Sequence, residues 1–309
     1  MNKRTLLNLG LLIVVVGLGL VAWLKPGIKK PAVQPPLIAL KAADIHSIRI
    51  DRHTGEIQLQ RKGANWEMLA PRHISADGFV IKAMLGNLSS PTTDHFKVTS
   101  AGLGKYGLAE PHIRLYLNGT EIDFGDTEPL EGNRYVKVGD TVYLTDGSLF
   151  YRLSHGPLWW VDKQLLPAHA HITAIQLPNA TLTLKGSKWQ LQPANPDITS
   201  DAIQKLVDAW HDARAVGVAK PGKGKSQGDV AIQLAGQSKP IRFEILANSG
   251  FLVLARPDLN LEYRLDNDNR KSMLHFQTAK PKKPATGHNG GKVIPHARTA
   301  GSRNHPPGH

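Results

Sequence analysis

An internal duplication constrains the fold of this chain more than any other feature of its sequence. Residues 44–69 and residues 171–192 carry the same succession of three segments in which apolar and polar side chains alternate. Such alternation is typical of half-buried β-strands. Trp66 in the first copy matches Trp189 in the second, and we expect both tryptophans to lie in equivalent hydrophobic cores.

Each copy continues with one amphipathic helix. Apolar residues recur at positions i, i+3, i+4 and i+7, which predicts one buried face: Ile81, Met84, Leu85 and Leu88 in the first copy, and Ile203, Leu206, Val207 and Trp210 in the second. Ser75 or Asp77 is expected to cap the first helix, and Thr199 or Ser200 the second.

More strands follow in both copies, after a Gly-x-Ala-x-Pro turn at residues 107–111 and 217–221. The first copy has alternating segments at 113–119, 120–126, 134–140 and 141–147, and the second has VAIQLAG, PIRFEIL, FLVLAR and LEYRL. Asn118-Gly119 is a hairpin turn signal. The pattern predicts an α+β, β-rich fold with two related modules, each an antiparallel sheet plus a helix.

An apolar run precedes the two copies. Residues 6–24 are nineteen residues in which Asn8 is the only strongly polar side chain. A helix of that length spans roughly 30 Å, the thickness of the hydrocarbon layer of a membrane. Since no A-x-A-like cleavage site ends the run, we expect an N-terminal transmembrane helix that is not cleaved, rather than a signal peptide.

The chain therefore divides into six expected segments. They are a short basic N-terminus (1–5), the transmembrane anchor (6–24), a Pro/Lys linker (25–40), a first module ending in a joining helix at about 158–166 (41–168), a second module (169–279) and a basic tail rich in His, Pro and Gly (280–309). The tail has almost no large apolar residues, so we expect it to be disordered.

The net charge of +13 resembles a nucleic-acid signal only until it is divided along the chain. Residues 1–30 carry five positive charges and residues 280–309 carry six, both without an acid, which leaves +2 for the middle. A folded region so close to neutral has no basic footprint for phosphate. We therefore expect no nucleic-acid partner.

The cysteine count and the anchor predict a location in the cell. The chain has no cysteine, which excludes disulfides and thiolate metal sites and favours a bacterial origin over a eukaryotic secreted one. Basic residues flank the apolar run on both sides, but a long following domain can be exported regardless of them. We expect a single-pass protein of the bacterial inner membrane, with a periplasmic ectodomain.

Two groups of side chains have the composition of a metal or acid–base site without its spacing. The densest acidic cluster lacks the pattern of a calcium loop and is expected to be a solvated hairpin: Asp123, Asp126, Glu128 and Glu131. His169 and His171 would share one face of a strand, but no third ligand lies near them in the sequence. We expect these two to be surface histidines.

Other candidate motifs are also incomplete. Ser148 and Ser154 lie near His155, but there is no Gly-x-Ser-x-Gly elbow. GKGKS at 222–226 lacks the spacing of a phosphate-binding loop and is expected to be a solvated hairpin loop. The tail histidines could chelate transition metals weakly: His288, His296, His305 and His309. The sequence assigns no catalytic, cofactor-binding or metal residue and no cofactor.

Trp159-Trp160 is the most suggestive aromatic feature. Adjacent residues rarely face the same way, so we expect one ring to pack between the two halves of the chain and the other to be more exposed. An exposed tryptophan at such a place is typical of a protein interface.

The stretches NWEMLAPRHISADGFVIKAMLGNL (65–88), KYGLAEP (105–111), FGDTEPLEGNRYVKVGDTVYLTD (124–146) and WWVDKQLLP (159–167) resemble the uncharacterised bacterial family called domain of unknown function 4340. The resemblance covers roughly residues 40–275. It implies N-terminally anchored envelope proteins, some encoded beside gliding-type ABC transporter components, and supplies no catalytic residues. The second half departs from the pattern, with Val216 where Tyr106 stands in the first.

Three functions stay open at the level of the sequence. The first is a scaffold or accessory subunit without enzymatic activity, bound to the bilayer through the N-terminal helix and to a membrane-protein partner, such as an ABC transporter. The second is a periplasmic module that binds a glycan or small molecule in the cleft between the halves. The third is a hydrolase that uses the acidic or histidine residues named above.

Overall fold

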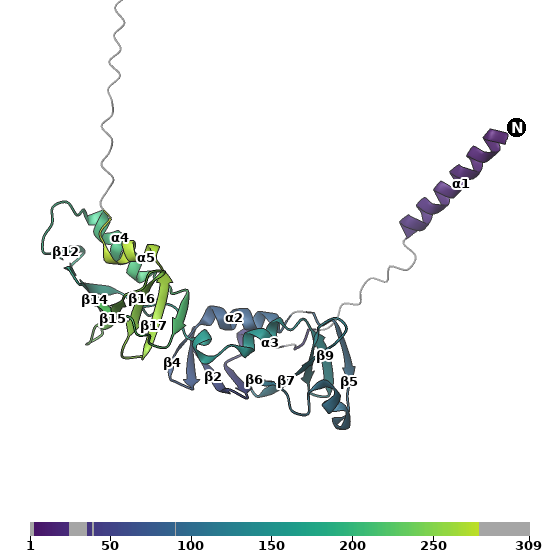
Figure 1. Ribbon diagram of the computed structural model, residues 1–309, viewed down its shortest axis with the longest axis horizontal. Helices are drawn as coiled ribbons and strands as arrows, with labels where there is room; N and C mark the ends of the chain where they lie inside the picture. Colours follow the sequence, from purple (N-terminus) through teal and green to yellow (C-terminus); the bar gives the residue numbers. More distant parts are fainter. Residues whose placement is uncertain (1–2, 25–35, 39, 90, 278–309) are drawn as a thin grey trace, which may run out of the picture.

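The computed structural model describes residues 3–24, 36–38, 40–89 and 91–277 (Figure 1). It is a β-rich α+β structure with two antiparallel sheets and several helices. This confirms the fold class that the alternating segments predicted.

The first sheet has nine strands in the order β4-β3-β2-β1-β6-β7-β8-β9-β5. Its strands are β1 (Ser47–Arg52), β2 (Gly55–Lys62), β3 (Asn65–Ala70), β4 (Ile74–Ala76), β5 (Asp94–Lys97), β6 (Ile113–Leu117), β7 (Thr120–Thr127), β8 (Arg134–Val138) and β9 (Thr141–Thr145). The helices of this part are η1 (Ala42–Asp44), α2 (Gly78–Asn87), η2 (Ser100–Tyr106), α3 (Ser148–Ser154) and η3 (Pro157–Trp160), where η marks a 3-10 helix.

The second sheet has eight strands in the order β12-β11-β10-β14-β15-β16-β17-β13. Its strands are β10 (Ile172–Leu177), β11 (Ala180–Lys185), β12 (Lys188–Gln192), β13 (Gly217–Ala219), β14 (Ser226–Leu234), β15 (Ile241–Leu246), β16 (Phe251–Arg256) and β17 (Leu261–Asp266). Two helices accompany this sheet, α4 (Ser200–His211) and α5 (Asp268–Leu274).

The two sheets have the same strand order once β4 is set aside, with β1 equivalent to β10 and β5 to β13. Two details of the expected match are therefore wrong. Gly217 lies inside β13, whereas Gly107 ends the insertion η2 with a left-handed backbone (φ +66°). Val216, which directly precedes β13, is consequently not the counterpart of Tyr106, because Tyr106 is the last residue of η2.

One main helix and one shorter helix cover each sheet on the same side (Figure 1). The carboxylate of Asp77 caps α2 by accepting from the backbone N–H groups of Phe79 and Val80, and the hydroxyl of Thr199 caps α4 by accepting from Ala202. The apolar faces expected from the i, i+3, i+4 spacing are buried in both helices. Their burial against the sheets forms a core that runs through both modules.

The two matched tryptophans differ in burial. Trp66 is 5% exposed, but Trp189 is only half-buried, which corrects the expectation of two equivalent core residues. The strand order explains the difference. Strand β4 pairs with β3 and places Ala76 opposite Trp66, whereas β12 is the edge of its sheet and has no strand beyond it.

The connection between the modules is not the helix expected at about 158–166. Only η3 is helical, and the chain then runs extended between the two modules. The Asp162 N–H donates to the carbonyl of Ser75 beside the first sheet, while the carbonyl of Lys163 accepts from the N–H of Ala215 in the second module. The segment adds backbone hydrogen bonds on both sides, which a helix could not do.

The N-terminal helix α1 runs over Lys3–Leu24, and its side chains are described for residues 9–20, where they are exposed. Within the described part of the chain, no helix has both the length and the hydropathy of a membrane span. Of the expected linker 25–40, residues 25–35 and 39 lie outside the described residues, while Leu37 is buried against the first module. The expected disordered tail lies outside them from residue 280 onward.

Candidate functional site

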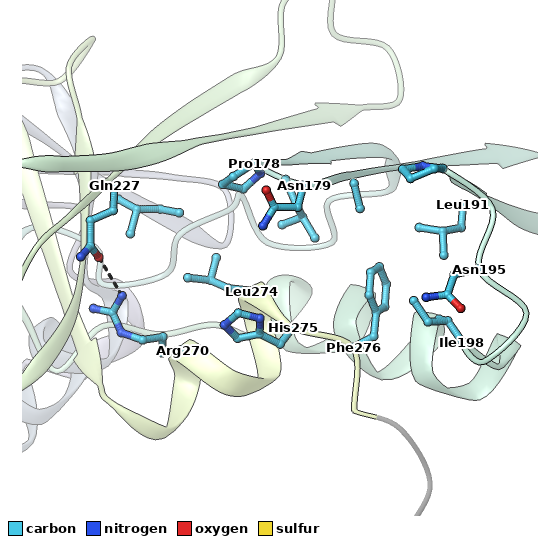
Figure 2. Close-up of a pocket in the computed structure, with 14 residues that line it drawn as sticks. Pro178, Asn179, Leu191, Asn195, Ile198, Gln227, Arg270, Leu274, His275 and Phe276 are labelled. Atoms are coloured by element: carbon cyan, nitrogen blue, oxygen red, sulfur yellow. Dashed lines mark hydrogen bonds between the residues drawn. The ribbon is translucent and has the colours of Figure 1, made fainter.

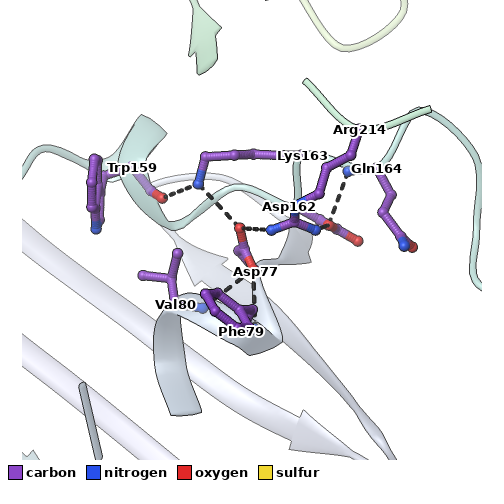
Figure 3. Close-up of polar contacts among 8 residues, drawn as sticks. All are labelled: Asp77, Phe79, Val80, Trp159, Asp162, Lys163, Gln164 and Arg214. Atoms are coloured by element: carbon purple, nitrogen blue, oxygen red, sulfur yellow. Dashed lines mark hydrogen bonds and ion pairs between the residues drawn. The ribbon is translucent and has the colours of Figure 1, made fainter. Parts of the chain in front are cut away.

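A buried carboxylate joins the two modules at their junction (Figure 3). Asp77 is 1% exposed, and while one of its oxygens caps α2, the other accepts from Lys163 Nζ at 3.0 Å and from an Arg214 guanidinium nitrogen at 2.6 Å. Asp77 comes from the first module, Lys163 from the connecting segment and Arg214 from the second module. One side chain thus ties three separate segments together.

The two carboxylates of this cluster, Asp77 and Asp162, have pKa values that are shifted in opposite directions. Burial alone would raise the pKa of Asp77, but the hydrogen bonds from Arg214 and Lys163 outweigh it and hold the pKa below its usual value. Burial raises the pKa of Asp162, and the nearby charge of Asp77 adds to that rise. Asp162 lies 3.8 Å from Arg214, too far for a strong hydrogen bond. The cluster therefore favours a charged Asp77 and disfavours a charged Asp162.

An aromatic surface lies beside this cluster and consists of Tyr151, His155 and Trp159. The His155 imidazole stacks on the Trp159 indole with ring centroids 4.1 Å apart, and Tyr151 meets His155 edge-on at 4.8 Å. The ammonium of Lys163 lies 5.2 Å from the centre of the Trp159 ring, within the range of a cation–π contact. The lysine that pairs with buried Asp77 therefore also holds Trp159 in place.

The aromatic surface presents apolar rings to solvent. Trp159 is 37% exposed and Tyr151 is more exposed still, whereas Trp160 is fully buried. The two adjacent tryptophans thus face different ways, as expected from the sequence. Burial lowers the pKa of His155, with a further contribution from Arg152, which favours the neutral imidazole. A pocket of about 390 Å³ adjoins these rings.

The acidic cluster predicted as a solvated hairpin is partly buried. Asp123 is paired with Lys137 at 3.1 Å, and Glu128 accepts the backbone N–H groups of Leu130 and Glu131 in its own loop. Only Asp126 and Glu131 are exposed, and Asp126 pairs with a histidine, His112, at 2.8 Å. The solvated interpretation is therefore wrong for Asp123 and Glu128, because both are buried, Asp123 with a cationic partner and Glu128 with backbone donors of its own loop.

The histidines expected at the surface are exposed. His169 and His171 precede β10, so they do not share the face of a strand. Within the described residues, no group of three or more His, Asp or Glu side chains is placed to hold a metal ion. The tail histidines, His288 to His309, lie outside the described residues.

The serines near His155 are engaged elsewhere. The Ser154 hydroxyl donates to the carbonyl of Phe150 within its own helix at 2.8 Å, and the Ser148 hydroxyl accepts from the Asn87 amide at 3.0 Å. Residues 222–226 are exposed; 222–225 lie in the connection between β13 and β14, and Ser226 begins β14. This connection is not a hairpin loop, because those two strands are not neighbours in the sheet.

The Asp77 cluster is the part of this site that the sequence did not reveal. Asp77 was expected only as one of two candidate helix caps, and its two cationic partners lie 86 and 137 residues further along the chain. No short motif spans such separations. The sequence places one lysine, Lys163, in the mainly apolar stretch 159–167 between the two copies, but gives no indication of its partner.

Comparison with known proteins identifies one family. The description of that family is "Domain of unknown function (DUF4340)", and it matches residues 66–228, which include Asp77, the connecting segment, Arg214 and the aromatic surface. No curated protein and no solved structure matches the chain. Since the matched residues make up more than half of the 309, the chain belongs to the DUF4340 family.

Proposed function

We propose that this protein is a single-pass protein of the bacterial inner membrane that serves as a scaffold or accessory subunit for a membrane-protein partner. In this proposal α1 is the anchor, the two modules lie in the periplasm, and the aromatic surface binds the partner. An ABC transporter is the partner class that the family resemblance favours. The observation that carries the proposal is the exposed Trp159, which stacks on His155 beside the junction of the two modules.

The physical basis for binding lies in the fixed geometry of the rings. Tryptophan and tyrosine are enriched in the energetic centres of protein interfaces because they bury a large area with few rotatable bonds. Trp159 and Tyr151 are already held by His155 and Lys163. Little side-chain entropy remains to be lost on binding, which favours association.

The anchoring part rests on α1. It forms one continuous helix of 22 residues, and its described side chains from Leu9 to Leu20 are apolar or glycine and exposed to solvent. Exposed apolar area of this kind is unfavourable in water at roughly 25 cal/mol per Å². A hydrocarbon environment removes that cost.

A fusion of alkaline phosphatase after residue 279 tests the location. We expect the fusion to be active, because that enzyme folds only outside the cytoplasm, and we expect detergent to be required to extract the protein. A cytoplasmic reporter at the same position should be silent. The opposite pair of reporter results, or a soluble mature chain that begins near residue 25, would contradict this part of the proposal.

Site-specific photocrosslinking in intact membranes tests the partner surface. A benzoylphenylalanine in place of Tyr151 is expected to give a discrete crosslinked species with a second protein, and Trp159→Ala should weaken that crosslink several-fold. The stability of Trp159→Ala should change by only about 0.5–1 kcal/mol, because the ring is partly exposed.

Phe251 supplies the matched control, since its side chain is also 37% exposed but lies in the second module. The same crosslinker at Phe251 should not give the species seen from Tyr151, and Phe251→Ala should leave the Tyr151 crosslink intact. Equal crosslinking from both positions, or a Tyr151 crosslink indifferent to Trp159→Ala, would refute the assigned surface.

A further inference from the structure

The second module contains a pocket of about 410 Å³ that is separate from the aromatic surface (Figure 2). It lies between the turn that joins β10 to β11, the loop after β12, and the end of α5. Its volume is within the range of natural small-molecule sites, which are mostly apolar with a few placed polar groups. The pocket lies inside one module and not in a cleft between the halves.

One end of the pocket is polar and cationic. Arg270 lies there, and its guanidinium donates to Gln227 Oε1 at 3.1 Å (Figure 2). It also donates to Asn267 Oδ1 at 3.3 Å and to the carbonyl of Phe251 at 3.3 Å. All of these acceptors are neutral. Across the described part of the chain, no carboxylate forms an ion pair with Arg270. The charge at this end is therefore available to an anion.

The other end of the pocket is mainly apolar. Figure 2 shows Phe276, Ile198 and Leu191 gathered at the side away from Arg270, with Asn195 beside them as the polar side chain there and Leu274 between the two ends. Phe276, Ile198 and Leu191 are only half-buried, although they pack against the core. Covering such partly solvent-exposed apolar side chains with an apolar ligand removes them from water, which lowers the free energy of the complex.

The first module has an arginine bridge at the position that corresponds to this pocket. Counting from the matched strands, Arg52 at the end of β1 corresponds to Asn179 after β10. Arg52 reaches across and donates to the carbonyl of His155, just past the end of α3, at 2.8 Å. Asn179 is too short to make this bridge. In the second module an arginine lies on helix α5 instead of on the strand. It is Arg270, the third residue of α5, where Phe150 is the third residue of α3.

We propose that this pocket binds an amphipathic anion, with a carboxylate or phosphate head on Arg270 and Gln227 and an acyl chain along Leu274 towards Phe276. The arginine supplies the charge-assisted, geometrically specific contact that such heads require. The apolar end supplies the burial of the chain. The charged head of such a ligand would lie at the cationic end of the pocket, and its acyl chain would lie at the apolar end.

Photolabelling of the full-length protein in phosphatidylcholine nanodiscs tests this site. The probe is dodecanoic acid that carries a diazirine on its chain, and its methyl ester serves as the uncharged match. We expect the acid to label peptides that contain Leu274 and Phe276, with unlabelled dodecanoate as a competitor. The ester should label them at least about tenfold less, because it cannot form the charge-assisted contact. Equal labelling by acid and ester would overturn the proposal.

Two substitutions place the binding at this pocket. Arg270→Gln should reduce labelling by the acid at least about tenfold, while Arg242→Gln, an exposed arginine on β15 outside the pocket, should not. Ala180→Phe places a bulky ring in the pocket wall and should block labelling without the loss of a charge. Circular dichroism confirms that each variant is folded. Unchanged labelling in folded Arg270→Gln or Ala180→Phe protein would overturn the site.

Two competitors distinguish the sources of such an anion. Stronger competition by free dodecanoate than by lauroyl lysophosphatidylglycerol assigns the site to a fatty acid, and the reverse order assigns it to a lipid of the bilayer. Failure of both to compete overturns the proposal. The result does not depend on the partner proposed for the aromatic surface, because the two sites lie in different modules.

Discussion

Asp77→Asn is expected to lower the free energy of unfolding by about 2–3 kcal/mol at pH 7. The asparagine keeps one side-chain oxygen for the cap of α2, but its NH2 group then replaces the oxygen that accepts from Lys163 and Arg214. The change therefore removes the negative charge together with both of these hydrogen bonds. A fully buried pair would cost more when broken, but Arg214 is partly exposed and can turn towards water. Urea unfolding of residues 36–277 measures the loss.

Asp162→Asn is the matched control for this experiment. It is the same chemical change on a neighbouring carboxylate, but the pKa of Asp162 is raised by burial, so its ionised form is disfavoured in the folded state. We expect Asp162→Asn to leave the stability at pH 7 unchanged or slightly higher. A loss as large as that of Asp77→Asn would mean that the junction tolerates no change of charge, and the assignment of Asp77 as its centre would be wrong.

The pH dependence gives a second readout of the same residue. The pKa of Asp77 is lowered on folding, so its contribution is present above the unfolded value of about 3.9 and is lost as the pH falls through the lower folded value. The difference in stability between wild type and Asp77→Asn should therefore shrink as the pH falls below about 4. A difference that is constant from pH 7 to pH 3 would exclude a charge effect.

The sequence offered Asp77 as one of two candidate helix caps, with Ser75 as the other, because capping is a local property read from a few consecutive residues. The structure selects Asp77. Its role at the junction could not be read in that way. Lys163 and Arg214 reach Asp77 only because the connecting segment runs extended between the modules. That conformation depends on backbone partners supplied by both modules, and no local propensity encodes it.

The alternation of apolar and polar residues likewise revealed the strands themselves but not which strands are neighbours in a sheet. Alternation located the matched strands β1 to β3 and β10 to β12, since the side-chain period of a strand is visible in one dimension. It could not show that β4 adds a strand beyond β3 while β12 remains an edge. It also could not align η2, an insertion in the first module, and so Tyr106 was matched to the wrong residue. Strand neighbours are set by tertiary pairing, which spacing alone does not reveal.

The second large prediction compares Trp66, on the inner strand β3, with Trp189, on the edge strand β12. Trp66→Ala is expected to lower the free energy of unfolding by about 3–5 kcal/mol, because the ring is buried in the core. Its removal leaves a cavity that the surrounding side chains fill only in part. Trp189→Ala should cost only about 1–2 kcal/mol, since the indole lies on the edge strand β12 and is already half in water.

Urea unfolding of residues 36–277 carrying each change compares the two copies directly. Because the residues occupy matched strands and the substitution is the same, the difference between them isolates the effect of the neighbouring strand β4. Equal costs in the intact protein would show that β4 does not shield Trp66, and the account of why the two copies diverge would fail.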